Sequence, residues 1–212
     1  MSFQKLVQSA QIHFPKLIIK YKDESLLMKI LGKIMFFNKA FMTDFTTTLG
    51  NTVYFPTKGY TDSHPVSASA VLMHELVHIS DYNKYGAILF TLGYASPQIF
   101  SLLVLPALFL LSWKLALLPL LFLLPIPSFF RAYFEKRAYM VSLYIIKRLD
   151  DKVDLSKSAQ FYISCFKNSA YYFMWPFSLN SEFDAAVSKI EAGSHPYQDD
   201  IFNVLDQIIN AS

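Results

Sequence analysis

The chain has 212 residues, of which 53% are hydrophobic and 17% charged, and its formal net charge at pH 7 is +3. This length is typical of one domain with a sizeable core, and the small, scattered positive charge does not predict nucleic-acid binding. The single cysteine, Cys165, excludes an intramolecular disulfide and a thiolate zinc cluster and is typical of a small core residue.

The first half of the chain predicts helices around one short strand. Residues 1–16 lack the uninterrupted apolar run of a signal peptide. Over residues 3–38 apolar side chains recur at intervals of three and four, which predicts one or two helices. Residues 46–57, TTTLGNTVYFPT, predict a strand over 52–55 because β-branched and aromatic residues follow a Gly-Asn pair. A helix should then begin at a cap formed by Ser67 or Ser69 and end at Gly86.

A long apolar block, residues 87–130, follows this helix. Residues 87–112 and 115–130 carry no charge, and the Trp113-Lys114 pair between them is typical of an interfacial tip. A membrane span needs about 20 apolar residues, so the first arm is long enough and the second is short. Prolines weaken both arms as regular helices. The block is therefore either a transmembrane hairpin or a hairpin that is re-entrant or buried by a protein partner.

The charges beside the block predict its orientation. Four basic residues flank the open end and one lies at the tip: Lys84, Arg131, Lys136, Arg137 and Lys114. By the positive-inside rule the open end faces the cytoplasm. Further helices are expected over residues 131–151, 158–177 and 199–210, with a link at residues 193–196.

The segment VLMHELVHIS, residues 71–80, carries a pattern suited to metal binding. Residues four apart project from one face of an α-helix, so His74 and His78 can bind one ion between their imidazoles. Glu75 is turned about 100° around the helix, where it can act on a bound water. A zinc hydrolase needs this arrangement, because zinc keeps three protein ligands and a water that a carboxylate deprotonates. The pattern also arises by chance, so a third ligand decides the interpretation.

The nearest carboxylate does not fit as that ligand. Asp81 lies seven residues after His74, or about 10 Å along a helix, and cannot reach an ion held by both histidines. Asp81 is better placed to orient His78 through a hydrogen bond. A histidine ten residues after His74 would complete another common pattern, but that position is Lys84.

Glu135 is the predicted third ligand. It is the first glutamate after Glu75, and it lies on the helix expected over residues 131–151. The alternative for Glu135 is a surface ion pair with Arg131, four residues earlier.

The order of these motifs resembles the gluzincin zinc peptidases, and within them it is similar to the membrane family of CAAX-prenyl and heat-shock proteases. HELVH, a hydrophobic hairpin and EKRAY follow one another, and the resemblance covers roughly residues 46–145. It implies a zincin-like metallopeptidase fold that hydrolyses peptide bonds. It also implies one Zn²⁺ held by His74, His78 and Glu135, with Glu75 as general base. Tyr139 stands where the family has an aspartate that supports a zinc histidine, and the N-terminal membrane helices of larger members are absent.

The same resemblance implies a substrate-binding strand before the motif helix, which receives the peptide as an added β-strand. That role falls to Thr52, Val53, Tyr54 and Phe55.

A zinc peptidase usually adds a group that stabilises the oxyanion. The candidates are Tyr139, Tyr171, Tyr172 and His195. For Tyr172 the alternative is aromatic packing within YYFMWPF, and for His195 it is a solvated place in the turn GSHPY.

The sequence therefore predicts a mainly α-helical (α+β) single domain, residues 1–212, with residues 87–130 inserted as a hydrophobic helical hairpin. The expected function is a zinc-dependent endopeptidase in a membrane, acting on a peptide or protein, with the hairpin in a lipid bilayer or against a hydrophobic protein partner. The alternative is a metallopeptidase-fold structural protein with little or no turnover, such as a virion or membrane-complex component. Tyr139 and the short second arm favour that alternative, and the chain is also similar to small metallopeptidase-like proteins encoded by tailed phages.

Overall fold

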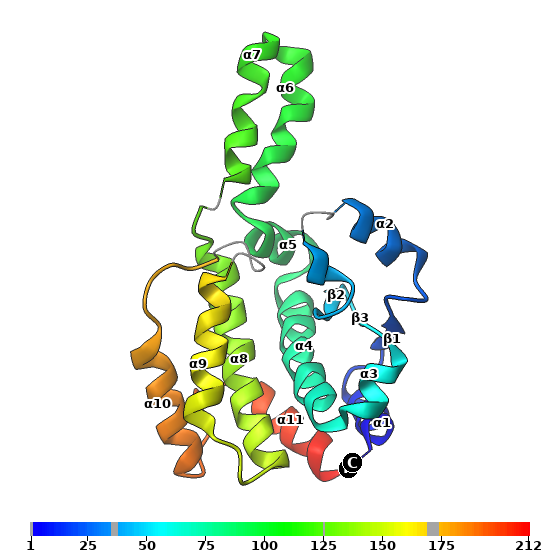
Figure 1. Ribbon diagram of the computed structural model, residues 1–212, viewed down its shortest axis with the longest axis vertical. Coiled ribbons are helices and arrows are strands. Elements are labelled where there is room, and N and C mark those ends of the chain that lie inside the picture. Colours follow the sequence, from blue (N-terminus) through cyan, green and yellow to red (C-terminus); the bar gives the residue numbers. More distant parts are fainter. Residues whose placement is uncertain (1, 35–37, 125, 169–173) are drawn as a thin grey trace.

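The computed structural model describes residues 2–34, 38–124, 126–168 and 174–212, and it is mainly helical with one small sheet, as expected (Figure 1). The α-helices are α1 Phe3–His13, α2 Leu26–Ile34, α3 Lys58–Ser63, α4 Pro65–Tyr85, α5 Ala87–Ala95, α6 Val104–Leu110, α7 Trp113–Ala116, α8 Phe129–Leu149, α9 Leu155–Lys167, α10 Asn180–Glu191 and α11 Ile201–Asn210. The 3-10 helices are η1 Lys39–Phe41, η2 Gln98–Leu103 and η3 Leu118–Leu123. The strands are β1 Ile18–Tyr21, β2 Thr47–Leu49 and β3 Thr52–Phe55.

The sheet has the order β1-β3-β2, with β1 parallel and β2 antiparallel to the central strand β3. The strand expected over residues 52–55 is confirmed as β3. Gly50 adopts a φ of 60° in the turn between β2 and β3, a conformation that favours glycine. The helical prediction for residues 3–38 is wrong over Ile18–Tyr21, which forms β1. This strand is stabilised by pairing with residues more than thirty positions away, which a local pattern does not reveal.

Two long helices, α4 and α8, lie side by side and run in opposite directions through the body (Figure 1). Both helices contribute fully buried residues, such as Leu76 and Leu143, to the core. Helix α4 begins at Pro65, earlier than the predicted caps, because proline is well suited to the first turn of a helix. It ends before Gly86, as predicted, where φ is 81°.

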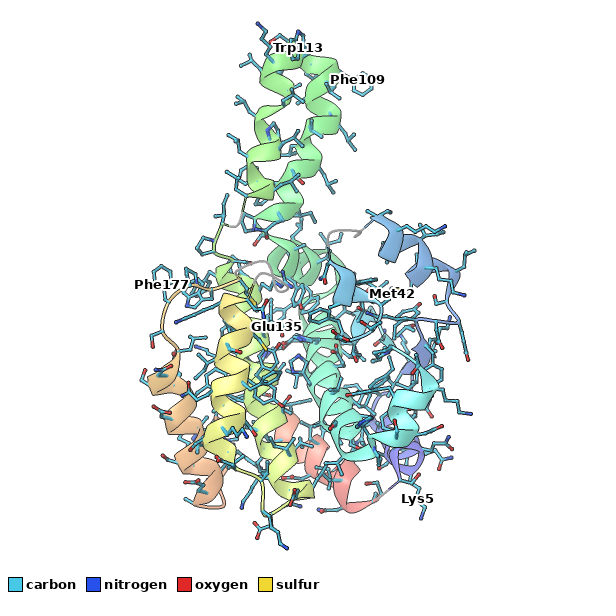
Figure 2. The ribbon with its side chains drawn as sticks, viewed as in Figure 1. Lys5, Met42, Phe109, Trp113, Glu135 and Phe177 are labelled. Atoms are coloured by element: carbon cyan, nitrogen blue, oxygen red, sulfur yellow. The ribbon has the colours of Figure 1, made fainter. Side chains whose placement is uncertain are left out.

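Elements α5 to η3 form the apolar hairpin; α5 lies against the body, and the segments from η2 to η3 project from one end of it (Figure 1). Figure 2 shows Phe109 and Trp113 at its far end, and the Phe109 side chain is 90% exposed. Among the described residues, no helix by itself is both long and apolar enough to cross a bilayer. Residues Ala87–Ala95 and Gln98–Leu110 pass that test only as a pair, which is bent by 98°.

The C-terminal helices pack against α8 and α1. Helix α11 confirms the helix expected over residues 199–210. The helix expected over 158–177 extends only to Lys167 as α9, and residues 174–177 are not helical. Helix α10 was not predicted. Cys165 is buried on α9, as expected.

Candidate metal centre

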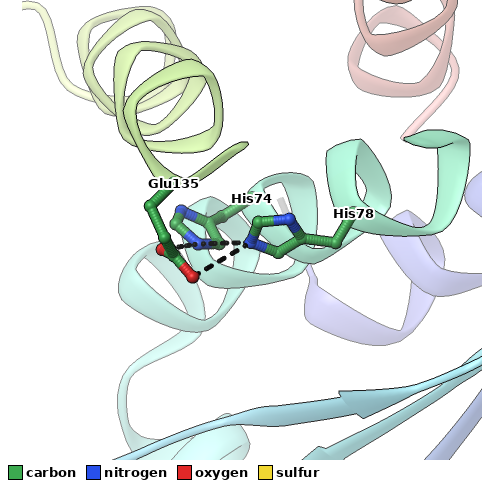
Figure 3. Close-up of side chains that lie close together, drawn as sticks. All are labelled: His74, His78 and Glu135. Atoms are coloured by element: carbon green, nitrogen blue, oxygen red, sulfur yellow. Dashed lines mark hydrogen bonds and ion pairs between the residues drawn. The ribbon is translucent and has the colours of Figure 1, made fainter. Parts of the chain in front are cut away.

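Helices α4 and α8 bring two histidines and a glutamate together, and their side chains point toward one another (Figure 3). The Nε2 atoms of His74 and His78 are 3.2 Å apart. Oε2 of Glu135 lies 3.4 Å from Nε2 of His74, and Oε1 lies 3.6 Å from Nε2 of His78. The exposed fractions of the three residues are 8%, 5% and 4%, so the surface ion pair considered for Glu135 is wrong. This buried group could hold a metal ion.

The tautomer of His74 suits metal binding. Nδ1 of His74 is 3.3 Å from Oγ of Ser142, whose hydroxyl donates to the carbonyl of Ala138. The serine oxygen therefore accepts from Nδ1–H, which leaves the lone pair on Nε2 for a ligand. Sequence reasoning missed Ser142. Its signal is the spacing of seven residues from Glu135, which puts both on one face of α8.

Tyr139, which stands where the resembled family has an aspartate, contacts His74 through its ring. The two ring centroids are 4.7 Å apart, and on its other side Tyr139 stacks on Tyr162 at 4.8 Å. Tyr139 therefore limits the orientation of the His74 ring by packing, whereas Ser142 supplies the hydrogen bond to Nδ1.

Asp81 does not orient His78, and that prediction is wrong. Both carboxylate oxygens of Asp81 accept from Nη1 of Arg137 on α8, at 2.6 and 2.7 Å, and Nη2 of Arg137 donates to Asp199. Nδ1 of His78 is buried and has no hydrogen-bond partner among the described residues. The charged guanidinium group is a stronger hydrogen-bond donor to the buried carboxylate than a neutral imidazole would be.

Helix α5 covers the group of His74, His78 and Glu135 with Tyr94, a residue that the sequence did not single out among thirteen tyrosines. The Tyr94 hydroxyl donates to Oε1 of Glu135. Its ring meets the His78 ring edge-on at 5.5 Å and stacks on Phe90 at 5.6 Å. The guanidinium of Arg131 lies 5.4 Å from the same ring. The first helix of the hairpin is thus part of the site.

The charges around the group are coupled. Burial alone would raise the pKa of Glu135, but His78, His74 and Arg131 outweigh it and lower that pKa well below its ordinary value. Burial lowers the pKa of His78 to about 4, so its imidazole is neutral near neutral pH. A carboxylate beside a neutral imidazole is a donor set that divalent metals bind.

Glu75 lies beside the group and faces the sheet. Burial raises its pKa, against the charge of His74 and of Lys22. The Thr48 hydroxyl on β2 is near the Glu75 carboxyl and acts to lower the pKa of Glu75. The two groups are not close enough or well enough aligned to count as hydrogen-bonded. Lys22 is fully buried and donates to the carbonyl of Phe41 at 2.6 Å. Sequence reasoning missed Lys22, which immediately follows the unpredicted strand β1.

Of the four candidates for a second catalytic group, Tyr139 contacts His74, whereas His195 lies away from the three candidate metal ligands. His195 is hydrogen-bonded to Asp206 at 3.1 Å and packs against Tyr144. Tyr144 lies nine residues after Glu135 on α8, a rise of about 13 Å. Tyr172, like Tyr171, lies outside the described residues.

The proposed substrate strand is already fully paired. Residues Thr52, Val53, Tyr54 and Phe55 form β3, which has β1 on one side and β2 on the other. The prediction that β3 receives an added strand is therefore wrong, because both of its edges are occupied. Of the two edge strands, β2 is the one that approaches Glu75, through Thr48.

No protein-family model, curated protein or solved structure matches this chain.

Proposed function

We propose that this protein is a zinc-dependent endopeptidase in which His74, His78 and Glu135 bind Zn²⁺. The observation that carries the proposal is the separation of their donor atoms, which is 3.2, 3.4 and 3.6 Å. Two ligands at tetrahedral zinc, each about 2.05 Å from the metal, stand about 3.3 Å apart. Two imidazoles and a carboxylate are also a donor set that occurs at catalytic zinc. The ligand helices α4 and α8, with the small sheet beside α4, support a zincin-like fold.

Glu75 is the proposed general base. Bound zinc would lower the pKa of a coordinated water toward neutrality and polarise a substrate carbonyl. Glu75 takes the proton of the attacking water and passes it to the leaving amine. Its burial raises its affinity for protons, as a base that must also act as an acid requires. Tyr94, Ser142 and Tyr139 hold the ligand side chains in place.

The peptide substrate is proposed to lie along β2. This strand is at the edge of the sheet, and no described strand pairs with its outer side. An extended peptide added there would form main-chain hydrogen bonds near Thr48 and Glu75. Because the metal group is buried under α5, productive binding requires α5 or its neighbours to move aside.

The hairpin is proposed to enter a lipid bilayer, with the catalytic side facing the cytoplasm. Its apolar side chains are exposed over its whole length, including Leu105, Leu110 and Leu118. A continuous apolar surface of this kind marks a membrane or protein interaction site.

A structural protein with little or no turnover, such as a virion or membrane-complex component, is the second candidate. The observation that favours it is the burial of His74, Glu75, His78 and Glu135, each 8% exposed or less, which leaves a substrate no direct route to the site. In that case a bound metal would act as a structural cross-link between α4 and α8.

Metal content and peptide cleavage test the proposal together. We expect about one zinc per chain in the purified full-length protein in detergent and its loss in Glu135→Ala. Glu75→Gln should retain zinc but lose cleavage of a peptide library. The matched control is Glu182→Gln, which breaks a partly exposed ion pair with Lys136 and should leave both unchanged.

Zinc-free wild type with an intact fold, or full cleavage by Glu75→Gln, would refute the peptidase. Zinc retained without any cleavage in wild type would favour the structural candidate.

A further inference from the structure

Helix α2 presents its apolar stripe to the outside. Leu26, Ile30 and Ile34 are spaced by four residues and share one face, and Leu26 is 73% exposed and Ile34 63%. In a soluble amphipathic helix this stripe normally faces the core. On α2 only Met28, on the opposite side, is buried, where it packs with Phe41 and Tyr54. The stripe is therefore left for something outside the body of the protein.

A surface hollow of about 420 Å³ lies along α2, and its lining is amphipathic. Leu26, Ile30 and Met42 provide apolar walls. Lys29 and Lys33 line the same hollow and are both exposed. Apolar walls with two cations suit a ligand that has an apolar chain and an anionic head.

The position of α2 indicates which surface it meets. Helix α2 lies at the end of the body from which the apolar hairpin projects (Figure 1). In Figure 2, Met42 is near that end, whereas Lys5 is at the opposite end. A bilayer that took up the hairpin would bring its headgroup layer to the level of α2. The hairpin and the α2 stripe would then contact one continuous lipid surface.

We propose that α2 is an in-plane lipid-binding helix that docks on anionic phospholipid. Leu26, Ile30 and Ile34 lie among the upper acyl chains, and Lys29 and Lys33 contact the phosphate groups. Short amphipathic helices with basic residues beside an apolar face bind membranes in this way. Each lysine near an anionic surface contributes roughly fivefold to the membrane partition coefficient. This rests on the proposed entry of the hairpin into a bilayer, but it goes beyond the proposed peptidase activity and requires no metal at the His74 group.

A depth probe on α2 tests the proposal in the full-length chain. An environment-sensitive dye is attached to the cysteine introduced by Ile30→Cys, and the protein is reconstituted into vesicles with quenchers placed at the headgroup level. The matched control is the dye at Ile12→Cys. Ile12 is also an exposed apolar helix residue, 74% exposed, but it lines a hollow with Lys5 at the far end of the body. Both substitutions are at exposed positions and leave the core unchanged.

We expect a severalfold stronger quenching at position 30 than at position 12 in vesicles of phosphatidylcholine with phosphatidylglycerol. Lys29→Gln combined with Lys33→Gln should weaken that quenching in anionic vesicles and change it little in phosphatidylcholine alone. The result should be the same in a Glu75→Gln background, which separates it from peptidase activity.

Equal, weak quenching at positions 30 and 12 would overturn the proposal. So would shielding of position 30 that appears only when a second protein is added, since the stripe would then be a protein-docking surface. An effect of the lysine pair that is the same in neutral and anionic vesicles would overturn the headgroup contact.

Discussion

Removing one hydroxyl group, with Tyr94→Phe, should weaken zinc binding by about 10- to 100-fold. The substitution keeps the ring that packs on Phe90 and His78 and removes only the donor to Oε1 of Glu135. A hydrogen bond to a buried charged group contributes about 1.5–3 kcal/mol. That range corresponds to about 10- to 160-fold in an equilibrium constant at 25 °C. The fold-change expected from the hydrogen-bond energy therefore agrees with the expected loss of zinc affinity. The physical reason for the loss is that the Glu135 carboxylate, without its donor, is no longer held toward the two histidines.

The zinc dissociation constant of the Tyr94→Phe variant can be measured by competition with a chromogenic chelator in detergent. Tyr85→Phe is the matched control, since Tyr85 lies on the neighbouring end of α4 and is 40% exposed. A dissociation constant for Tyr94→Phe within twofold of wild type would refute the reasoning. A tighter one would also refute it, because it would mean that the phenol competes with the metal for Glu135.

Three further results are expected. Zinc affinity should fall as the pH drops below 7, approaching tenfold per pH unit, because a proton competes with the metal for Nε2 of His74. Burial alone would lower the pKa of His74, but the Glu135 carboxylate outweighs burial and raises it. Competition with a chelator at several pH values measures this dependence. Burial lowers the pKa of Lys22 to about 8, so the folded state loses this proton at lower pH than the unfolded chain. The free energy of unfolding of the wild type should therefore rise by about 2 kcal/mol between pH 8 and 10, whereas that of Lys22→Met should not show this rise. Urea unfolding at the two pH values measures the difference. A matching pH dependence in Lys22→Met would contradict this. Asp81→Asn should cost about 2 kcal/mol of stability, because it leaves the partly buried Arg137 with one carboxylate partner instead of two. An unchanged thermal unfolding midpoint would contradict this.

The meeting of His74, His78 and Glu135 was predictable because its sequence signal is short and geometric. His74 and His78 are neighbours on any helix that contains them, and local sequence places them on one. Glu135 could be reached by elimination, since the chain has few glutamates and the nearer carboxylate was excluded by the length of a helix. Strand β3 and the end of α4 were also fixed locally, by a β-branched run after a Gly-Asn turn and by Gly86.

The surroundings of the group were not predictable because they depend on contacts between distant segments. Asp81 had two possible partners, and only the packing of α8 against α4 shows that Arg137 outcompetes His78. Tyr94 belongs to the apolar block, whose sequence pattern indicates only that the segment is hydrophobic. The pattern therefore could not predict the hydrogen bond from Tyr94 to Glu135. The pairing of β1 with β3, which closes β3 to a substrate, is likewise a long-range property.

Helix α5 belongs to the apolar hairpin and also contacts the group of His74, His78 and Glu135, a connection that the sequence did not predict. Its inner side carries Tyr94 and Phe90 against His78, while its outer side exposes Ile88 and Leu89. No residue of α5 is fully buried, and the helix is held against the body by the ring packing of Phe90 and Tyr94 and by the hydrogen bond from Tyr94 to Glu135. Any movement of the hairpin that lifts α5 must break that hydrogen bond and expose the ligands to solvent at the same step. A change in the surroundings of the hairpin can therefore alter the geometry of the His74, His78 and Glu135 group through α5, because this helix belongs to the hairpin and also contacts the group.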